Sequence, residues 1–124
     1  MNAKRVLSVG QCGADDAGLR RMFVNQLGLE MTAADTAEEA LAVLRGGAFD
    51  LVLVNRVLDY DGSSGVDLVG RIKADAGLAG VPVMLVSNFE EAQREAVARG
   101  ALPGFGKAAL GQPHMLARVE PYLR

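Results

Sequence analysis

The sequence predicts a single α/β domain over residues 1–124, in which helices cover both faces of a parallel β-sheet. Strand-like apolar segments alternate five times with amphipathic segments of helical length. The segment 51–54, Leu-Val-Leu-Val, is apolar at every position, which is typical of a strand covered on both faces. A chain of 124 residues, half of them hydrophobic, also has the usual size of one domain with a real core.

Five short apolar segments are predicted to be the strands, each followed by a helix. We expect strands at 5–9, 29–33, 51–54, 81–87 and 102–105. Pro82 is tolerated only at the start of the fourth strand, because it has no N–H to donate. In a βα series the crossovers are right-handed, so the carboxyl ends of all five strands should meet at one edge of the sheet.

The helices are predicted from capping and periodicity signals. We expect them at 17–27, 36–45, 66–74, 90–99 and 113–123. Asp15 or Asp16 can cap the first, and residues 36–39 form a capping box for the second. Residues 88–91 are expected to cap the fourth helix, and Pro113 suits the first turn of the last.

Composition argues against several classes of function. Charged residues make up 23% and the formal net charge is −2, which is not the charge pattern of a protein that binds nucleic acid or an anionic membrane. No apolar run approaches the ~20 residues of a membrane span, and the N-terminal residues do not resemble a signal peptide. Cys12 is the only cysteine, so no intrachain disulfide is possible. We therefore expect a cytoplasmic protein.

Polar side chains stand where the predicted strands end. Gln11 follows the first strand, Asn55 ends the third and Ser87 ends the fourth, while Lys107 follows the fifth. In open α/β sheets, ligands and chemistry are found beyond the carboxyl ends of the strands. These side chains are therefore expected to converge on a candidate site.

With these residues, the chain resembles a receiver domain of bacterial two-component response regulators over essentially its whole length. The resemblance implies a flavodoxin-like (βα)5 fold with strand order 2-1-3-4-5. In that family an acidic pair after the first strand binds Mg²⁺, an Asp ending the third strand accepts phosphate, and a Lys follows the fifth strand. Ser87 and Lys107 match the family's hydroxyl and lysine positions, and Gly100-Ala101 resembles the Gly-Ala before its fifth strand.

The sequence departs from the family pattern at positions that the family uses for phosphorylation and metal binding. Asn55 stands at the phosphate-acceptor position, and Gly10 and Gln11 stand at the acidic pair. Gly104 replaces the aromatic switch residue, while Phe105 should point to the other side of the strand. An Asn amide is not a carboxylate nucleophile, and without acidic side chains nothing obvious holds Mg²⁺. The chain thus resembles a pseudo-receiver without catalytic residues, metal or cofactor.

Two classes of function follow. The first is a stand-alone, non-enzymatic signalling module that binds a protein partner without phosphorylation, through the face of the last two helices and the fifth strand that the resemblance implies. The second is a module that binds a small molecule or anion in the remnant of the site. The expected pocket is framed by Gln11, Cys12, Asn55, Arg56, Ser87 and Lys107, with Asn88 as a further candidate ligand residue.

Two further alternatives concern the loop after the first strand. Asp15 and Asp16 either cap the following helix and favour its dipole, or swing back to replace the acidic pair, and capping is the favoured alternative. Cys12 precedes a helix N-terminus, where the pKa of a thiol can fall, so a Cys12-dependent enzyme is a third hypothesis. The Cys-x5-Arg pattern of low-molecular-weight phosphatases is not met, because Gly18 is the sixth residue after Cys12.

Overall fold

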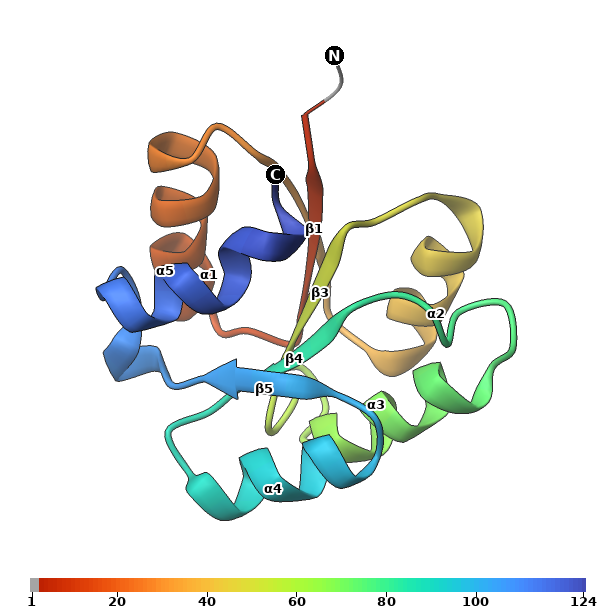
Figure 1. Ribbon diagram of the computed structural model, residues 1–124. Helices are drawn as coiled ribbons and strands as arrows, with labels where there is room; N and C mark the ends of the chain where they lie inside the picture. The colour runs from red at the N-terminus through yellow and green to blue at the C-terminus, as the bar shows by residue number, and fades with distance from the viewer. Residues whose placement is uncertain (1–2) are drawn as a thin grey trace.

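The computed structural model describes residues 3–124 as a five-stranded parallel sheet between two layers of helices (Figure 1). The strands are β1 (Arg5–Val9), β2 (Glu30–Ala34), β3 (Leu51–Asn55), β4 (Val83–Val86) and β5 (Leu102–Phe105). Their order, β2-β1-β3-β4-β5, is the predicted one, and every neighbouring pair is parallel. No helix within residues 3–124 has the length and apolarity that a membrane span requires.

The helices follow the strands in alternation. They are α1 (Gly13–Arg20) with its π-helical continuation η1 (Arg21–Gln26), α2 (Ala37–Gly46), α3 (Gly65–Ala74), α4 (Glu90–Ala98) and α5 (Pro113–Val119), with short 3₁₀ turns η2 (Lys107–Ala109) and η3 (Glu120–Tyr122). Figure 1 shows α1 and α5 together on one face of the sheet and α2, α3 and α4 on the other.

Strand β3 lies in the middle of the sheet and is buried on both faces, which confirms the prediction from its apolar run. Leu51 and Leu53 pack with α1, η1 and α5, whereas Val52 and Val54 pack with α2, α3 and α4. All four are completely buried. Because successive side chains of a strand point to opposite faces, a strand between two helical layers is apolar at every position.

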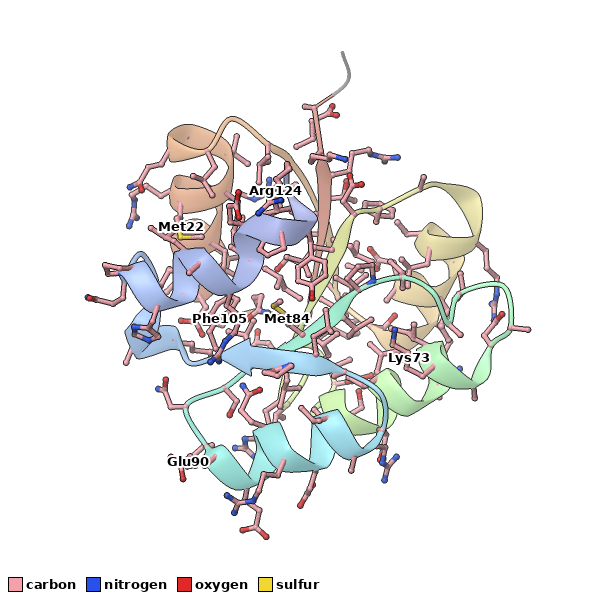
Figure 2. All side chains as sticks on the ribbon, viewed as in Figure 1. Met22, Lys73, Met84, Glu90, Phe105 and Arg124 are labelled. Carbon is pink, nitrogen blue, oxygen red and sulfur yellow. The ribbon has the colours of Figure 1, made fainter. Side chains whose placement is uncertain are left out.

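The helix layer formed by α1, η1 and α5 packs on the sheet over a core rich in large side chains. Figure 2 places Met22 of η1, Met84 of β4 and Phe105 of β5 in this region, and all three are buried. Phe105 therefore points away from the α4 side of the sheet, as its alternation with Gly104 predicted.

Two capping predictions are wrong. Helix α1 begins at Gly13 rather than near residue 17, and its N-cap is Cys12, not Asp15 or Asp16. The connection from β1 is thus shorter than predicted, and the Cys12 Sγ accepts the free N–H of Asp15 at 3.5 Å. Helix α4 begins after Phe89, and no side chain caps it. The capping box at α2 is confirmed on its Thr36 side, where Oγ1 accepts the Glu39 N–H at 3.1 Å.

Strand β5 does not pair regularly with β4. Met84 is opposite Leu102 and Val86 is opposite Phe105, so β5 contains one residue more than β4 over this stretch. Gln93 of α4 fills the irregularity: its Oε1 accepts the Gly104 N–H at 3.1 Å, and its Nε2 donates to the carbonyl of Leu85 at 2.9 Å. A side chain from α4 therefore replaces the missing ladder bonds between the last two strands.

The close contact at Gly104 leaves no room for a side chain. A Cβ at this position would lie 2.1 Å from the Leu85 carbonyl oxygen and 2.8 Å from the Gln93 Oε1. The position that resembles the aromatic switch of receivers is thus filled by backbone and by Gln93.

Candidate functional site

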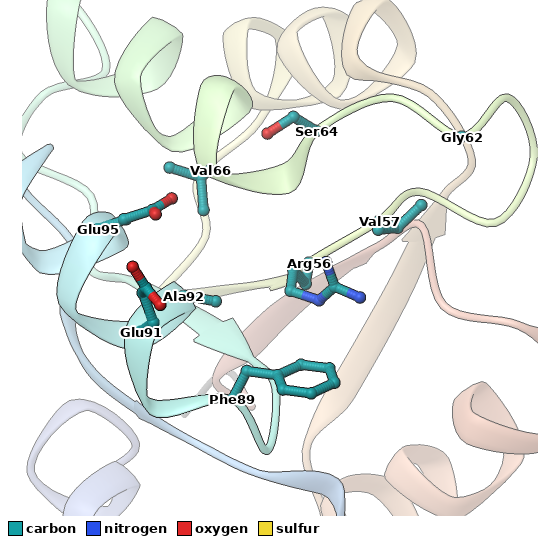
Figure 3. A pocket seen from close by; sticks show the side chains of 9 residues that line it. All are labelled: Arg56, Val57, Gly62, Ser64, Val66, Phe89, Glu91, Ala92 and Glu95. Atoms are coloured by element: carbon teal, nitrogen blue, oxygen red, sulfur yellow. The ribbon is translucent and has the colours of Figure 1, made fainter.

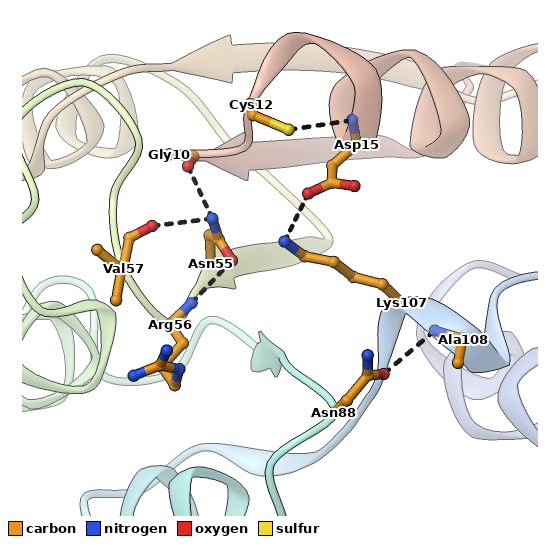
Figure 4. Close-up of polar contacts among 9 residues, drawn as sticks. All are labelled: Gly10, Cys12, Asp15, Asn55, Arg56, Val57, Asn88, Lys107 and Ala108. Atoms are coloured by element: carbon orange, nitrogen blue, oxygen red, sulfur yellow. Dashed lines mark hydrogen bonds and ion pairs between the residues drawn. The ribbon is translucent and has the colours of Figure 1, made fainter.

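Asn55, at the carboxyl end of β3, lies at the same edge of the sheet as Lys107 and the loop after β1 (Figure 4). Its Nδ2 donates to the carbonyl oxygens of Gly10 at 3.1 Å and Val57 at 2.8 Å. Its Oδ1 accepts the N–H of Arg56 at 3.0 Å. Asn55 is 9% exposed, so the amide uses both donor hydrogens and its acceptor within a buried corner.

This hydrogen-bond pattern requires an amide. A carboxylate has no hydrogen to donate, and an Asp in the same rotamer would face the two carbonyl oxygens of Gly10 and Val57. The two carbonyl oxygens around position 55 therefore require a side chain that donates hydrogen bonds, as Asn55 does.

The loop after β3 fills the space next to Gly10, which stands at the first position of the family's acidic pair. An isolated bridge between Val57 and Ser64 closes this loop, and Leu58 at its turn is completely buried. Gly10 has a φ of +73°, and a Cβ on it would lie 2.3 Å from the Leu58 Cδ2 and 2.9 Å from the Leu58 Cα. An acidic side chain at position 10 is excluded both by the backbone conformation and by Leu58.

Asp15 does enter the site, but it pairs with Lys107 instead of facing Asn55. The Asp15 Oδ2 lies 2.5 Å from the Lys107 Nζ (Figure 4). The pKa of the Asp15 carboxyl is lowered, first because Lys107 donates a hydrogen bond to it and to a smaller extent because of Cys12 and the Lys107 charge, while burial opposes the shift. Asp15 therefore does not cap α1 but pairs with Lys107, and Asp16 pairs with Arg20 on its own helix.

Gln11 contributes to the lining of a small cavity beside this ion pair. Its Oε1 and Nε2 are inaccessible to solvent and have no hydrogen-bond partner among residues 3–124. The cavity has a volume of about 90 Å³, and Asp15 and Lys107 share its lining with apolar residues such as Leu19 and Phe105. Buried amide groups are nearly always paired, so this one is an exception.

The residues expected to frame one pocket do not line a single cavity. Gln11 and Lys107 line the small cavity, whereas the guanidinium of Arg56 turns away and lies 4.7 Å from the centre of the Phe89 ring. Ser87 and Asn88 line a different groove beside α4, where the Asn88 Oδ1 accepts the Ala108 N–H at 3.1 Å. These residues lie along the same edge of the sheet, but the loops between them separate the small cavity from the groove beside α4.

Sequence reasoning missed Leu58 and Gln93. Nothing in the local sequence marks Leu58 as different from other loop residues, and Gln93 lies within an ordinary amphipathic helix. Their roles depend on contacts with Gly10 and Gly104, which are 48 and 11 positions away in the chain.

A doubly covered parallel sheet of order 2-1-3-4-5, with polar groups at the carboxyl ends of β3 and β4 and a lysine after β5, is the arrangement of receiver-type domains. Solved structures agree on the fold. A response regulator receiver protein from Pseudomonas putida superposes with a TM-score of 0.78 at 21% identity, and a response regulator from Thermotoga maritima with 0.77 at 20%; each alignment covers 98% of both chains.

Two relatives found by sequence comparison identify the family as well as the fold. Chemotaxis protein CheY of Pseudomonas aeruginosa is 33% identical over 94 residues, which are 73% of this chain and 73% of that protein. Chemotaxis protein CheY-3 of Vibrio cholerae is 34% identical over 94 residues, 73% of this chain and 69% of its own. No family model matches the chain. The identity to these relatives shows that the chain belongs to the response regulator receiver family.

Proposed function

We propose that this receiver-family chain is a signalling module that works by binding a protein partner, without phosphorylation of the domain. The observation that carries the proposal is the bonding of Asn55, whose amide donates to two backbone carbonyls at the acceptor position. Leu58 adds to it by filling the space beside Gly10, where the first member of a metal-binding acidic pair would stand.

Hydrogen bonds hold the elements of the expected partner-binding face, α4 and β5, in a fixed arrangement with β4. Gln93 ties α4 to Leu85 in β4 and to Gly104 in β5, so α4 and the sheet are linked by side-chain hydrogen bonds. Because position 104 has no side chain, no aromatic residue at that position can move between an inward and an outward rotamer. This supports a partner surface that is permanently available rather than switched on.

The face of α4, β5 and α5 has features of a binding surface for a protein. A groove of about 320 Å³ on this face includes Arg94, Val97, Pro103 and Arg118 in its lining, and Val97 is 43% exposed. Pro103 has no N–H, and Arg118 donates to the Gly104 carbonyl, so the outer edge of β5 is poorly suited to adding another strand. A partner would pack side chains into the groove, with acidic groups near Arg94.

The absence of phosphorylation is tested by mass spectrometry after incubation with acetyl phosphate and Mg²⁺. We expect no added phosphoryl mass on the wild-type chain or on Asn55→Asp. The substitution also removes two donated hydrogen bonds and should lower the free energy of unfolding by about 1–3 kcal/mol. An acyl phosphate on the wild-type chain would contradict the proposal, whereas one on Asn55→Asp would show that the missing carboxylate alone prevents phosphorylation.

The partner surface is tested by comparing two charge reversals. Arg94→Glu changes the groove beside β5, whereas Arg21→Glu makes the same change on the opposite helix layer. Proteins of the native host that bind the wild type and Arg21→Glu, but not Arg94→Glu, would identify partners of this face. Equal capture by all three chains would place the interaction elsewhere.

A second candidate function, binding of a small molecule, is favoured by the cavity of about 90 Å³ that Gln11 helps to line and by the unpaired amide of that residue. Asp15 and Lys107 in the same lining neutralise each other, so a neutral molecule with donor and acceptor groups fits best. Titration with acetamide should shift the NMR signals of the Gln11 side-chain amide in a saturable manner, and inorganic phosphate should not. No shift with either probe would remove this candidate.

A further inference from the structure

The structure assigns a second docking groove to the opposite side of α4, for a partner segment that presents a basic side chain. This groove lies between α4, the start of α3 and the loop after β3 (Figure 3). Its volume is about 440 Å³, and its lining includes none of the residues that line the groove beside β5. The inference does not depend on the proposed function.

The groove has a buried apolar floor and an exposed rim. Val66 and Ala92 form the floor and are buried, while the other seven lining residues are exposed. Two of those are large apolar side chains, Phe89 with 61% and Val57 with 41% of its surface exposed. An open groove with apolar residues on its rim fits a segment of another protein better than a small molecule, which is normally enclosed.

Uncompensated negative charge on one side of the groove indicates what the segment must carry. Glu91 and Glu95 are one turn apart on α4 and their carboxylates face the same hollow (Figure 3). Neither makes an ion pair within residues 3–124, and Arg99, one turn further along, is held instead by Asp67 at 3.1 Å. Like charges at this spacing repel each other, and a cation placed between them relieves the repulsion.

The other side of the groove is positive and aromatic. Arg56 lies over the Phe89 ring and makes no ion pair with the described residues. Its guanidinium can donate hydrogen bonds to a carbonyl or carboxylate oxygen of the incoming segment. The occupant we infer is therefore a peptide segment with Lys or Arg next to an apolar residue, the basic side chain lying between Glu91 and Glu95.

The probe for this inference is a phage-displayed random heptapeptide library, selected on the immobilised full chain. Selected peptides should be enriched in Lys or Arg beside an apolar residue. The best peptide, made synthetically, should bind the double variant Glu91→Gln/Glu95→Gln about three- to tenfold more weakly than the wild type, and the difference should shrink at high salt. In NMR, the peptide should shift amides in 56–66 and 89–95.

Glu90→Gln is the matched control, because Glu90 precedes this pair and lines the groove on the β5 side of α4. It should leave the affinity unchanged. The inference is overturned if no basic peptide is selected, if Glu90→Gln weakens binding as much as the double variant, or if lysine amide alone binds as tightly as the peptide. Self-association of the chain that the double variant abolishes would also overturn it, since the occupant would then be a second copy. None of these results bears on the Arg94→Glu comparison.

Discussion

At position 55 the side chain is an amide, whereas a phosphate acceptor would need a carboxylate. The NH₂ group of Asn55 donates to Gly10 and Val57 and so holds the ends of two loops together. A carboxylate at this place would set negative charge against two carbonyl oxygens. The amide therefore stabilises the same corner in which receivers of the usual pattern carry out their chemistry.

The ion pair between Asp15 and Lys107 should make the stability of the chain depend on pH. Lys107 lowers the pKa of the folded Asp15 carboxyl below the ordinary value of ~3.9, which the unfolded chain retains. The stabilisation is therefore fully present above pH ~4 and is lost as pH falls through the folded pKa. Both side chains are about one-third exposed, so we expect at most ~1 kcal/mol at pH 7.

Urea denaturation of the wild type and Asp15→Asn between pH 7 and pH 3 measures this contribution. The difference in the free energy of unfolding should be largest near neutrality and shrink as pH falls below ~4. Asp35→Asn is the control, because Asp35 is exposed and its carboxylate makes no hydrogen bond or ion pair within residues 3–124. A difference that grows on acidification would contradict the assigned ion pair.

At the scale of elements, the unusual feature is the junction of α4 with β4 and β5. One side chain, Gln93, supplies bonds that a regular ladder would have supplied, and Gly104 makes the close approach possible. The orientation of α4 relative to the sheet is thus fixed by hydrogen bonds as well as by the burial of Ala92 and Ala96.

Replacing Gln93 with Ala should loosen this junction more than its modest loss of apolar contact implies. The Gly104 N–H would lose its acceptor inside the fold, which should cost about 1–3 kcal/mol of unfolding free energy. Hydrogen exchange at the Gly104 amide should accelerate by more than exchange in β1. Gln26→Ala, an exposed substitution in η1, should change neither quantity.

For the whole molecule, β3 is the point at which the two core layers meet. Leu53 belongs to the layer with α1 and α5, and its neighbour Val54 belongs to the layer with α2, α3 and α4. Because one strand contributes to both layers, neither is expected to remain ordered without the other.

We therefore expect Leu53→Ala and Val54→Ala to shift one common unfolding transition. The first should cost about 2–5 kcal/mol and the second about 1.5–3 kcal/mol, since each opens a cavity in a completely buried position. Far-UV circular dichroism and tyrosine fluorescence should report the same midpoint in both variants; of the two tyrosines, Tyr122 packs beside the layer that contains Leu53. Separate midpoints would mean that the two layers unfold independently.

The sequence by itself determined the features that depend on local pattern. The alternation of apolar strands and amphipathic helices predicted the element order, and the unbroken apolar run at 51–54 predicted the central strand. Thr36 and Pro113 had the local conformations predicted for them, because capping and backbone preference act within a few residues. The resemblance of Ser87 and Lys107 to receiver positions was sufficient to predict the family.

Only the tertiary structure decided how the site is filled. That Leu58 occupies the space beside Gly10, that Asp15 pairs with Lys107, and that Gln93 completes the sheet at Gly104 all follow from contacts between distant segments. The expected pocket was divided for the same reason: strand ends share an edge by topology, but the loops that connect them choose which side chains face one another. Distances between loops depend on packing across the whole fold, and no local pattern in the chain encodes them.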